Sequence, residues 1–161
     1  MCGIAGILSF TDVRPEASLL EKMSVPLQRR GPDGGKVFCE GPIGFAHRRL
    51  GIIDVDSRAD QPFHDTETGN TMVFNGTIYN YRELRSVLKD KGHKFHTESD
   101  TEVLLKSYAE WGEKCLNHLI GMFAFAIWDR KKQKMFVARD RIGIKPLYFS
   151  HDQKNFLFAS N

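Results

Sequence analysis

Apolar residues occur in short runs of strand length along most of the chain. The first run, Gly3 to Phe10, is apolar without helical spacing, which is typical of a strand covered on both faces. Later runs predict further strands at 37–39, 43–47, 71–74, 123–128, 135–139, 147–149 and 156–158. Turn-forming residues separate the runs, most clearly from Arg30 to Gly35. The pattern therefore predicts a domain that is rich in strands.

Helical spacing appears in three places. Glu16 to Leu27 follows a proline and should end or kink early, because Pro26 lies inside it. Its expected apolar face consists of Leu19, Leu20, Met23 and Leu27. A second helix is expected from Tyr81 to Leu88, closed by Gly92. A third should begin at Ser99 to Glu102, which fits the capping-box pattern, and stop at Gly112.

Composition indicates one globular domain of mixed α and β structure. The chain has 161 residues, of which 41% are apolar and 27% charged, and no linker or repeat interrupts the predicted elements. Its net charge of +3 is small, and acidic and basic residues are interspersed. This distribution argues against binding to nucleic acid or to a membrane surface, and favours small soluble partners.

The three cysteines, Cys2, Cys39 and Cys115, are widely spaced and odd in number. They do not suggest a disulfide framework or a zinc site, and the six histidines form no metal-binding motif. The apolar start lacks the basic region and cleavage site of a signal peptide, and no apolar run is long enough to span a bilayer. We therefore expect a cytoplasmic protein without a bound metal.

Cys2 is the first candidate for chemistry. Removal of the initiator methionine would leave a thiol and a free α-amine on the same residue. The amine can take the thiol proton near neutral pH, so one residue would supply both a nucleophile and its base. Without further information, a small cysteine at the start of an apolar strand is more often a buried core residue.

Several separate segments together resemble the glutaminase domain of class II glutamine amidotransferases, and most of all that of glutamine-hydrolysing asparagine synthetases. These segments are the Met-Cys-Gly-Ile start, Arg30 to Gly34, His47 to Leu50, Asn75-Gly76 with Ile78 to Asn80, Ser99-Asp100, Gly121 to Ala126, Arg139 to Arg141 and Gly143 to Tyr148. They cover nearly the whole chain in the order of the family. The resemblance implies an α+β fold of the N-terminal nucleophile type, a four-layer α/β/β/α sandwich of two antiparallel sheets between helices.

The resemblance also implies which residues act at the reacting end of a glutamine site. Cys2 matches the nucleophile, and Asn75 and Gly76 match the residues that stabilise the oxyanion. An Asn side chain and a Gly N–H are suitable donors for such a charge. Judged by local pattern alone, Asn75-Gly76 is more typical of a type I′ hairpin turn.

At the other end of the site, Arg49 matches the family arginine that binds the α-carboxylate of glutamine, Asp100 matches the aspartate that binds its α-ammonium, and Ile53 matches a residue that lines the pocket. A guanidinium suits a carboxylate because it offers two parallel donors. Without the resemblance, Arg49 would be taken for a solvated surface residue and Asp100 for an acid favoured in the first turn of a helix.

Two positions depart from the family pattern. Thr77 stands where the family usually has a glutamate that helps to hold the substrate ammonium, so we expect weaker glutamine binding. Arg29 stands where histidine is common, and the sequence offers no physical account of that change.

We expect residues 1–161 to form a single type-2 glutamine amidotransferase domain that hydrolyses L-glutamine to glutamate and ammonia. The ATP-pyrophosphatase domain of a full synthetase is absent from this chain, so ATP and Mg²⁺ would be needed only there, and the glutaminase domain itself needs no cofactor. The ammonia would pass to a synthetase domain or partner protein, and we expect one that forms asparagine. Alternatives are a sugar-amidating or phosphoribosylamine-forming amidotransferase, a non-catalytic glutamine-binding module, and a hydrolase of another amide.

Overall fold

A computed structural model describes residues 2–50 and 60–161 of the chain. Its strands are β1 (Gly3–Ser9), β2 (Gly34–Glu40), β3 (Ile43–Arg49), β4 (Phe63–His64), β5 (Thr71–Ile78), β6 (Gly121–Asp129), β7 (Lys134–Arg139), β8 (Tyr148–His151) and β9 (Asn155–Ala159). Its helices are α1 (Ala17–Ser24), α2 (Tyr81–Asp90) and α3 (Asp100–Trp111), with short 3₁₀ helices η1 (Val25–Leu27) and η3 (Gly112–Asn117). In the described part of the chain, each helix is too short or too polar to cross a membrane.

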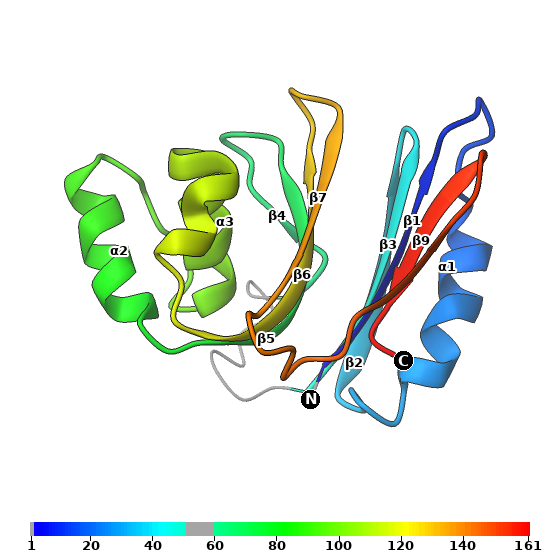
Figure 1. Cartoon of the computed structure of the whole chain (residues 1–161), viewed down its shortest axis with the longest axis horizontal. Helices are drawn as coiled ribbons and strands as arrows, with labels where there is room; N and C mark the ends of the chain where they lie inside the picture. The colour runs from blue at the N-terminus through cyan, green and yellow to red at the C-terminus, as the bar shows by residue number, and fades with distance from the viewer. Residues whose placement is uncertain (1, 51–59) are drawn as a thin grey trace.

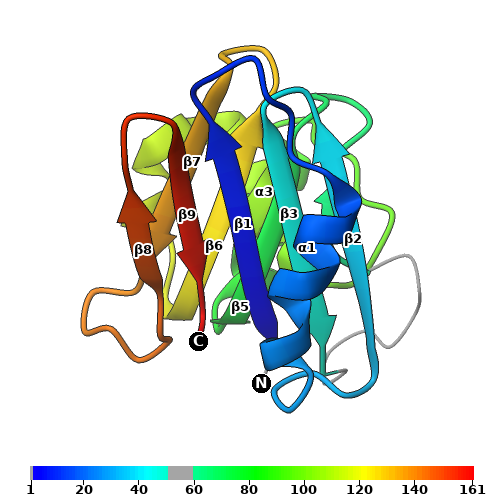
Figure 2. The same cartoon turned by 90° about the vertical axis from the view of Figure 1, so that its right-hand side faces the viewer.

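The strands form two antiparallel sheets that face each other. One sheet has the order β2-β3-β1-β9-β8 and the other β4-β5-β6-β7. Helices α2 and α3 cover the outer face of the second sheet, and α1 covers the outer face of the first (Figures 1 and 2). This arrangement confirms the expected α/β/β/α sandwich.

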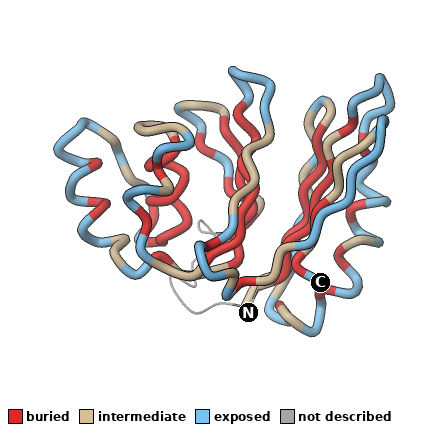
Figure 3. The backbone as a smooth tube through the Cα atoms, in the orientation of Figure 1, coloured by how far each residue is buried: buried red, intermediate tan, exposed pale blue. Residues whose placement is uncertain are grey.

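Apolar side chains fill the spaces between the layers, as the buried stretches of the facing strands show (Figure 3). Strand β1 illustrates how one strand serves two of these layers. Ile4 belongs to the cluster between the sheets, whereas Ala5 and Ile7 belong to the cluster beneath α1. Because successive side chains of a strand point to opposite faces, a strand covered on both sides must be apolar throughout. The apolar run at the start of the chain is thereby explained.

The first helix is confirmed in position but not in every detail. The chain leaves the α-helix at Ser24 and continues as the 3₁₀ helix η1, which contains Pro26. Leu20 of α1 and Leu27 of η1 are buried against the first sheet as expected, but Leu19 is 42% exposed. Leu19 was therefore wrongly included in the predicted apolar face.

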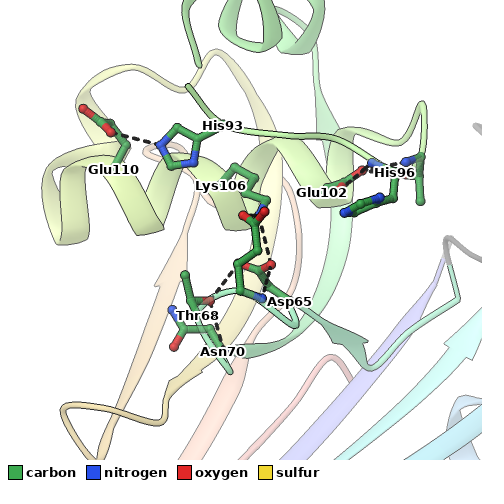
Figure 4. Close-up of polar contacts among 10 residues, drawn as sticks. Asp65, Thr68, Asn70, His93, His96, Glu102, Lys106 and Glu110 are labelled. Atoms are coloured by element: carbon green, nitrogen blue, oxygen red, sulfur yellow. Dashed lines mark hydrogen bonds and ion pairs between the residues drawn. The ribbon is translucent and has the colours of Figure 1, made fainter. Parts of the chain in front are cut away.

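The start of α3 differs from a capping box. Ser99 caps the helix by accepting a hydrogen bond from the N–H of Thr101 (3.1 Å). The Glu102 carboxylate does not return to Ser99. It accepts hydrogen bonds from the backbone N–H groups of His96 (3.0 Å) and Thr97 (2.8 Å), as Figure 4 shows for His96. Glu102 thereby fixes the loop that leads into Asp100, the first residue of the helix.

Strand β5 is longer than the predicted 71–74. Its residues Asn75 and Gly76 pair with Ala124 and Phe123 of β6. They lie within the ladder, so the hairpin-turn interpretation of this Asn-Gly pair is wrong. The two-residue strand β4 and the 3₁₀ helix η3 had no counterpart in the sequence pattern.

A buried ion-pair cluster ties α3 to the connection between β4 and β5 (Figure 4). Lys106 of α3 is 1% exposed, and its Nζ lies 2.9 Å from Oδ1 of Asp65 and 2.5 Å from Oε2 of Glu67. The Thr68 hydroxyl donates to the other Asp65 oxygen (2.7 Å). The cluster holds the helix that carries Asp100 close to the strand that carries Asn75.

We predict that Asp65→Ala lowers the free energy of unfolding by about 3 kcal/mol, because removing one partner of a buried ion pair leaves the other charge poorly compensated. Urea unfolding would measure the loss. The matched control is Glu113→Ala, which breaks the exposed pair with Lys134 and should cost less than about 1 kcal/mol. Equal losses in the two variants would contradict the prediction.

Candidate active site

A cavity of about 170 Å³ lies where strand ends of both sheets meet the start of α3. It brings together residues that the sequence analysis singled out from four distant segments. These residues are Cys2, Arg49, Asn75, Gly76 and Asp100, and Thr77 lines the same cavity. Ile53, the remaining candidate, lies outside the described residues.

Antiparallel pairing explains part of this convergence. Gly3 at the start of β1 pairs with Arg48 near the end of the neighbouring strand β3. Cys2 and Arg49 therefore lie at the same end of these two strands. Asn75 and Gly76 belong to β5 of the facing sheet, and Asp100 begins the helix that covers it. The cavity therefore depends on the packing of the two sheets and not on any single local motif.

Cys2 is partly exposed in this cavity. Its Sγ accepts a hydrogen bond from the N–H of Leu50 (3.4 Å), and Nε of Arg30 donates to the carbonyl oxygen of Cys2 (3.4 Å). Cys115, in contrast, is fully buried in the apolar core, where burial raises its pKa to about 12. Of these two thiols, only that of Cys2 is placed to meet a small ligand.

Asn75 holds a buried donor that is not satisfied within the described residues. The residue is 1% exposed, and its Nδ2 has no hydrogen-bond partner there. An unsatisfied buried donor costs about 1–3 kcal/mol. The donor lines the same cavity as Cys2, so an oxygen atom bound in the cavity could satisfy it.

Gly76 is required by the packing of the adjacent strand. A Cβ atom at this position would lie 2.3 Å from the Met122 carbonyl oxygen and 2.7 Å from Cα of Phe123. Both of these are backbone atoms of β6 and cannot move aside independently. A larger residue would therefore displace β6 and change the wall of the cavity.

Arg49 forms an ion pair with Asp60, which also lies 2.8 Å from Nζ of Lys36. Partial burial tends to raise the pKa of Asp60, but Lys36 and Arg49 bring it below its usual value. Two cations thus surround one carboxylate, and the group as a whole carries a positive charge. That charge makes this side of the cavity suitable for an anion.

Asp100 is buried at the first turn of α3, and its Oδ2 accepts a hydrogen bond from the N–H of Ile78 (3.0 Å). Burial raises its pKa above the usual value, although backbone hydrogen bonds oppose this effect. Asp100 is both a helix-start acid and a cavity residue. The two interpretations of the sequence are therefore compatible.

His47 and Lys145 are cavity residues that received no role in the sequence analysis. His47 is buried, and its Nε2 has no partner within the described residues. Lys145 lies in the segment Gly143 to Tyr148, which carries part of the family resemblance. Nothing in the spacing of its segment indicates that it lies beside Cys2, because that proximity arises from the way the chain crosses between the sheets.

The chain is similar to known proteins in sequence and in fold. A family described as a glutamine amidotransferase domain matches residues 1–161. Asparagine synthetase [glutamine-hydrolyzing] 3 of Bacillus subtilis is 43% identical over 99% of the chain, and asparagine synthetase B [glutamine-hydrolyzing] of Escherichia coli is 37% identical over 100%. The chain spans only 26% and 29% of the lengths of these two relatives.

A solved structure with the same fold is the glutamine phosphoribosylpyrophosphate amidotransferase of B. subtilis. The two structures superpose with a TM-score of 0.78 at 24% identity, covering 99% of this chain and 42% of the other. At this level of identity the likeness concerns the fold.

We predict that His47 makes the folded protein less stable as the pH falls below 6.5. Burial and then the charge of Arg49 lower the pKa of His47 from 6.5 to about 3. Between these values the unfolded chain binds a proton that the folded chain does not, so stability decreases toward acid pH. The free energy of unfolding should therefore decrease between pH 7.5 and 5.5, and His47→Gln should make this decrease smaller by about 1.4 kcal/mol.

Urea unfolding of the wild type and of His47→Gln, each at about pH 7.5 and pH 5.5, would test this prediction. The comparison uses only the pH-dependent part of the free energy of unfolding, so a constant effect of the substitution cancels. The same pH dependence in both proteins would contradict it.

Proposed function

We propose, because the chain belongs to the glutamine amidotransferase domain family, that it hydrolyses the side-chain amide of L-glutamine to glutamate and ammonia. Cys2, freed of Met1, would be the nucleophile. The unsatisfied side-chain donor of Asn75, buried in the same cavity as the Cys2 thiol, is the observation that carries the proposal. Nδ2 of Asn75 would donate a hydrogen bond to the oxygen atom that becomes negative in the reaction.

The proposed reaction has two stages. The thiol of Cys2 gives its proton to its own α-amine, and the sulfur attacks the δ-carbon of glutamine. The C–S bond forms while one electron pair of the carbonyl moves to oxygen. When this pair returns, the C–N bond breaks and the departing nitrogen takes the proton from the amine, leaving as ammonia. Water then cleaves the thioester to release glutamate and restore the thiol.

Asn75 and Gly76 would stabilise the oxyanion. Donors that are already in place before the reaction stabilise a developing charge more effectively than donors that must reorient. Asn75 lies within the β5–β6 ladder and Gly76 is held against the β6 backbone, so their positions are fixed by the sheet.

The other end of the cavity would hold the two charges of the amino acid. Arg49 would bind the α-carboxylate, in the surroundings that Lys36 makes positive. Asp100 would bind the α-ammonium, which would in turn favour the ionised form of this buried carboxylate. Ile53 stays a candidate from the family resemblance.

Beyond this half-reaction, we propose that the ammonia is passed to an ATP-dependent synthetase that forms asparagine, since the two relatives named above are asparagine synthetases. The glutaminase chemistry requires only protein groups and water. ATP and Mg²⁺ would act in the synthetase part, and the cytoplasm is the expected location.

A second candidate is a module that binds glutamine without hydrolysing it. Thr77 favours this alternative, because it lines the cavity at a position where the family usually supplies a carboxylate. The two candidates differ in turnover, since a binding module would release no ammonia.

We predict that ammonia release from glutamine requires both Cys2 and the removal of Met1. Intact mass and ammonia production would be measured on one sample, with Cys2→Ala as the test and Cys39→Ala as the matched control. We expect the first variant to be inactive and the second to be as active as the wild type. Binding of glutamine without ammonia from a sample that lacks Met1 would support the module instead.

We predict further that Thr77→Glu lowers KM for glutamine by roughly tenfold, because a hydrogen bond to a charged group contributes about 1.5–3 kcal/mol. The value of kcat should stay within a factor of about 2 of the wild type, because the substitution lies at the binding end. Thr77→Gln, of equal length and neutral, is the control and should not lower KM. An unchanged KM in Thr77→Glu would refute the prediction.

A further inference from the structure

Lys145 is a nearly buried cation in the wall of the active-site cavity. It is 5% exposed and lines the cavity together with Cys2, Asn75 and Gly76. It belongs to the connection between β7 and β8, which crosses from one sheet to the other (Figure 1). Neither the oxyanion donors nor the groups proposed for the ends of glutamine include it.

The backbone around Lys145 is held by one carboxylate. Oδ2 of Asp140 accepts hydrogen bonds from the N–H groups of Lys145 (3.0 Å) and Phe123 (3.2 Å), and Oδ1 accepts one from Ile144 (2.8 Å). The Phe123 bond anchors the connection to β6, the strand that pairs with Asn75 and Gly76. Lys145 is therefore fixed to the same framework as the oxyanion donors.

Lys145 shares the cavity wall with Cys2, and the charges of the two residues interact. Its ammonium interacts electrostatically with the thiol of Cys2, with Arg30 and with Asp140. Burial, and then Arg30, lower the pKa of Lys145, whereas Cys2 and Asp140 oppose this shift. A negative charge that forms beside Cys2 during the reaction would be attracted to this ammonium.

We propose that the Lys145 ammonium stabilises the oxyanion that forms when the Cys2 sulfur attacks the side-chain carbonyl of glutamine. This inference rests on the proposed function. Lys145 acts through its charge and keeps its proton while the C–S bond forms and the carbonyl electron pair moves to oxygen. Asn75 and Gly76 supply neutral donors, and Lys145 adds a full positive charge in a site of low dielectric constant, where charges interact strongly.

The test uses an aldehyde analogue of glutamine, L-glutamate γ-semialdehyde, which forms a tetrahedral adduct with a thiol. The adduct carries a polar oxygen where the reaction develops an oxyanion, whereas the comparison ligand L-norvaline keeps the two charges of the amino acid and has no side-chain oxygen. Dissociation constants for both ligands would be measured with the 161-residue chain, the variants Lys145→Met and Lys145→Arg, and Lys131→Met as an exposed control. Ammonia release by the same samples gives kcat and KM.

We expect Lys145→Met to weaken binding of the aldehyde and to lower kcat, each roughly tenfold to a hundredfold. Its affinity for L-norvaline and its KM for glutamine should stay close to wild-type values. Lys145→Arg should retain most of the aldehyde affinity, and Lys131→Met should match the wild type. Equal losses for the aldehyde and L-norvaline would assign Lys145 a structural role and overturn the proposal, as would unchanged aldehyde binding in Lys145→Met.

A pH series keeps the proposal testable even if Lys145→Met does not fold. Because the pKa of Lys145 lies below its usual value, its charge is lost as the pH rises through that pKa. Arginine keeps its charge throughout. The ratio of aldehyde affinities, Lys145→Arg over wild type, should therefore increase at alkaline pH, while the neighbouring charged groups, among them Cys2, Arg30 and Asp140, are the same in both proteins. A constant ratio would overturn the proposal.

The same measurements separate failure of this inference from failure of the proposed function. If the wild type forms the aldehyde adduct and releases ammonia while Lys145→Met behaves like Lys131→Met, only the role of Lys145 is lost. If the wild type forms no adduct through Cys2, the nucleophile assignment fails and the role of Lys145 fails with it.

Discussion

The packing of the two sheets against each other is the constraint on which the rest of the structure depends. Ile4 and Phe45 from one sheet and Val73 and Ala124 from the other belong to the apolar cluster between them. Each of these side chains lies within a few residues of a cavity group. The apolar layer therefore positions Cys2 and Asn75 relative to each other, although neither residue belongs to it. A change in the packing of this layer would therefore shift Cys2 relative to Asn75.

Buried polar groups differ in how far the described part of the chain satisfies them. The Lys106 ammonium is surrounded by carboxylates, and Glu102 accepts several backbone hydrogen bonds. At or beside the cavity, Arg30, His47 and Asn75 each have a buried nitrogen without a partner in the described part of the chain. Such groups reduce stability, and a fold retains them where a ligand can complete their hydrogen bonds. Glu40, Arg48 and Arg85 also have such a buried polar atom, so the donor of Asn75 points to a ligand because it lines the cavity that holds Cys2.

Most of the elements could be predicted from the sequence because they depend on local spacing, whereas the four layers were expected only from the family resemblance. The apolar run of β1 and the helix stop at Gly112 are examples. The Asn75-Gly76 pair could not be resolved locally, since the same two residues suit a tight turn and a strand. Glu102 deviated from the capping pattern because a neighbouring loop offered its carboxylate better-placed donors. The location of Lys145 depends on a connection between two sheets, and no spacing rule describes such a connection.

The charges of the cavity are distributed in the way that the proposed reaction requires. Glutamine carries its two permanent charges at one end, and Arg49 and Asp100, which line the cavity, are the residues proposed to bind them. Its amide end is neutral and becomes negative only as the tetrahedral intermediate forms. A permanent anion near Cys2 would oppose that step, whereas Lys145 and Arg30 make this end positive. A cation there has little to gain from the neutral amide and much to gain from the oxyanion. Its contribution is therefore expressed in the rate of the reaction more than in the affinity for the substrate.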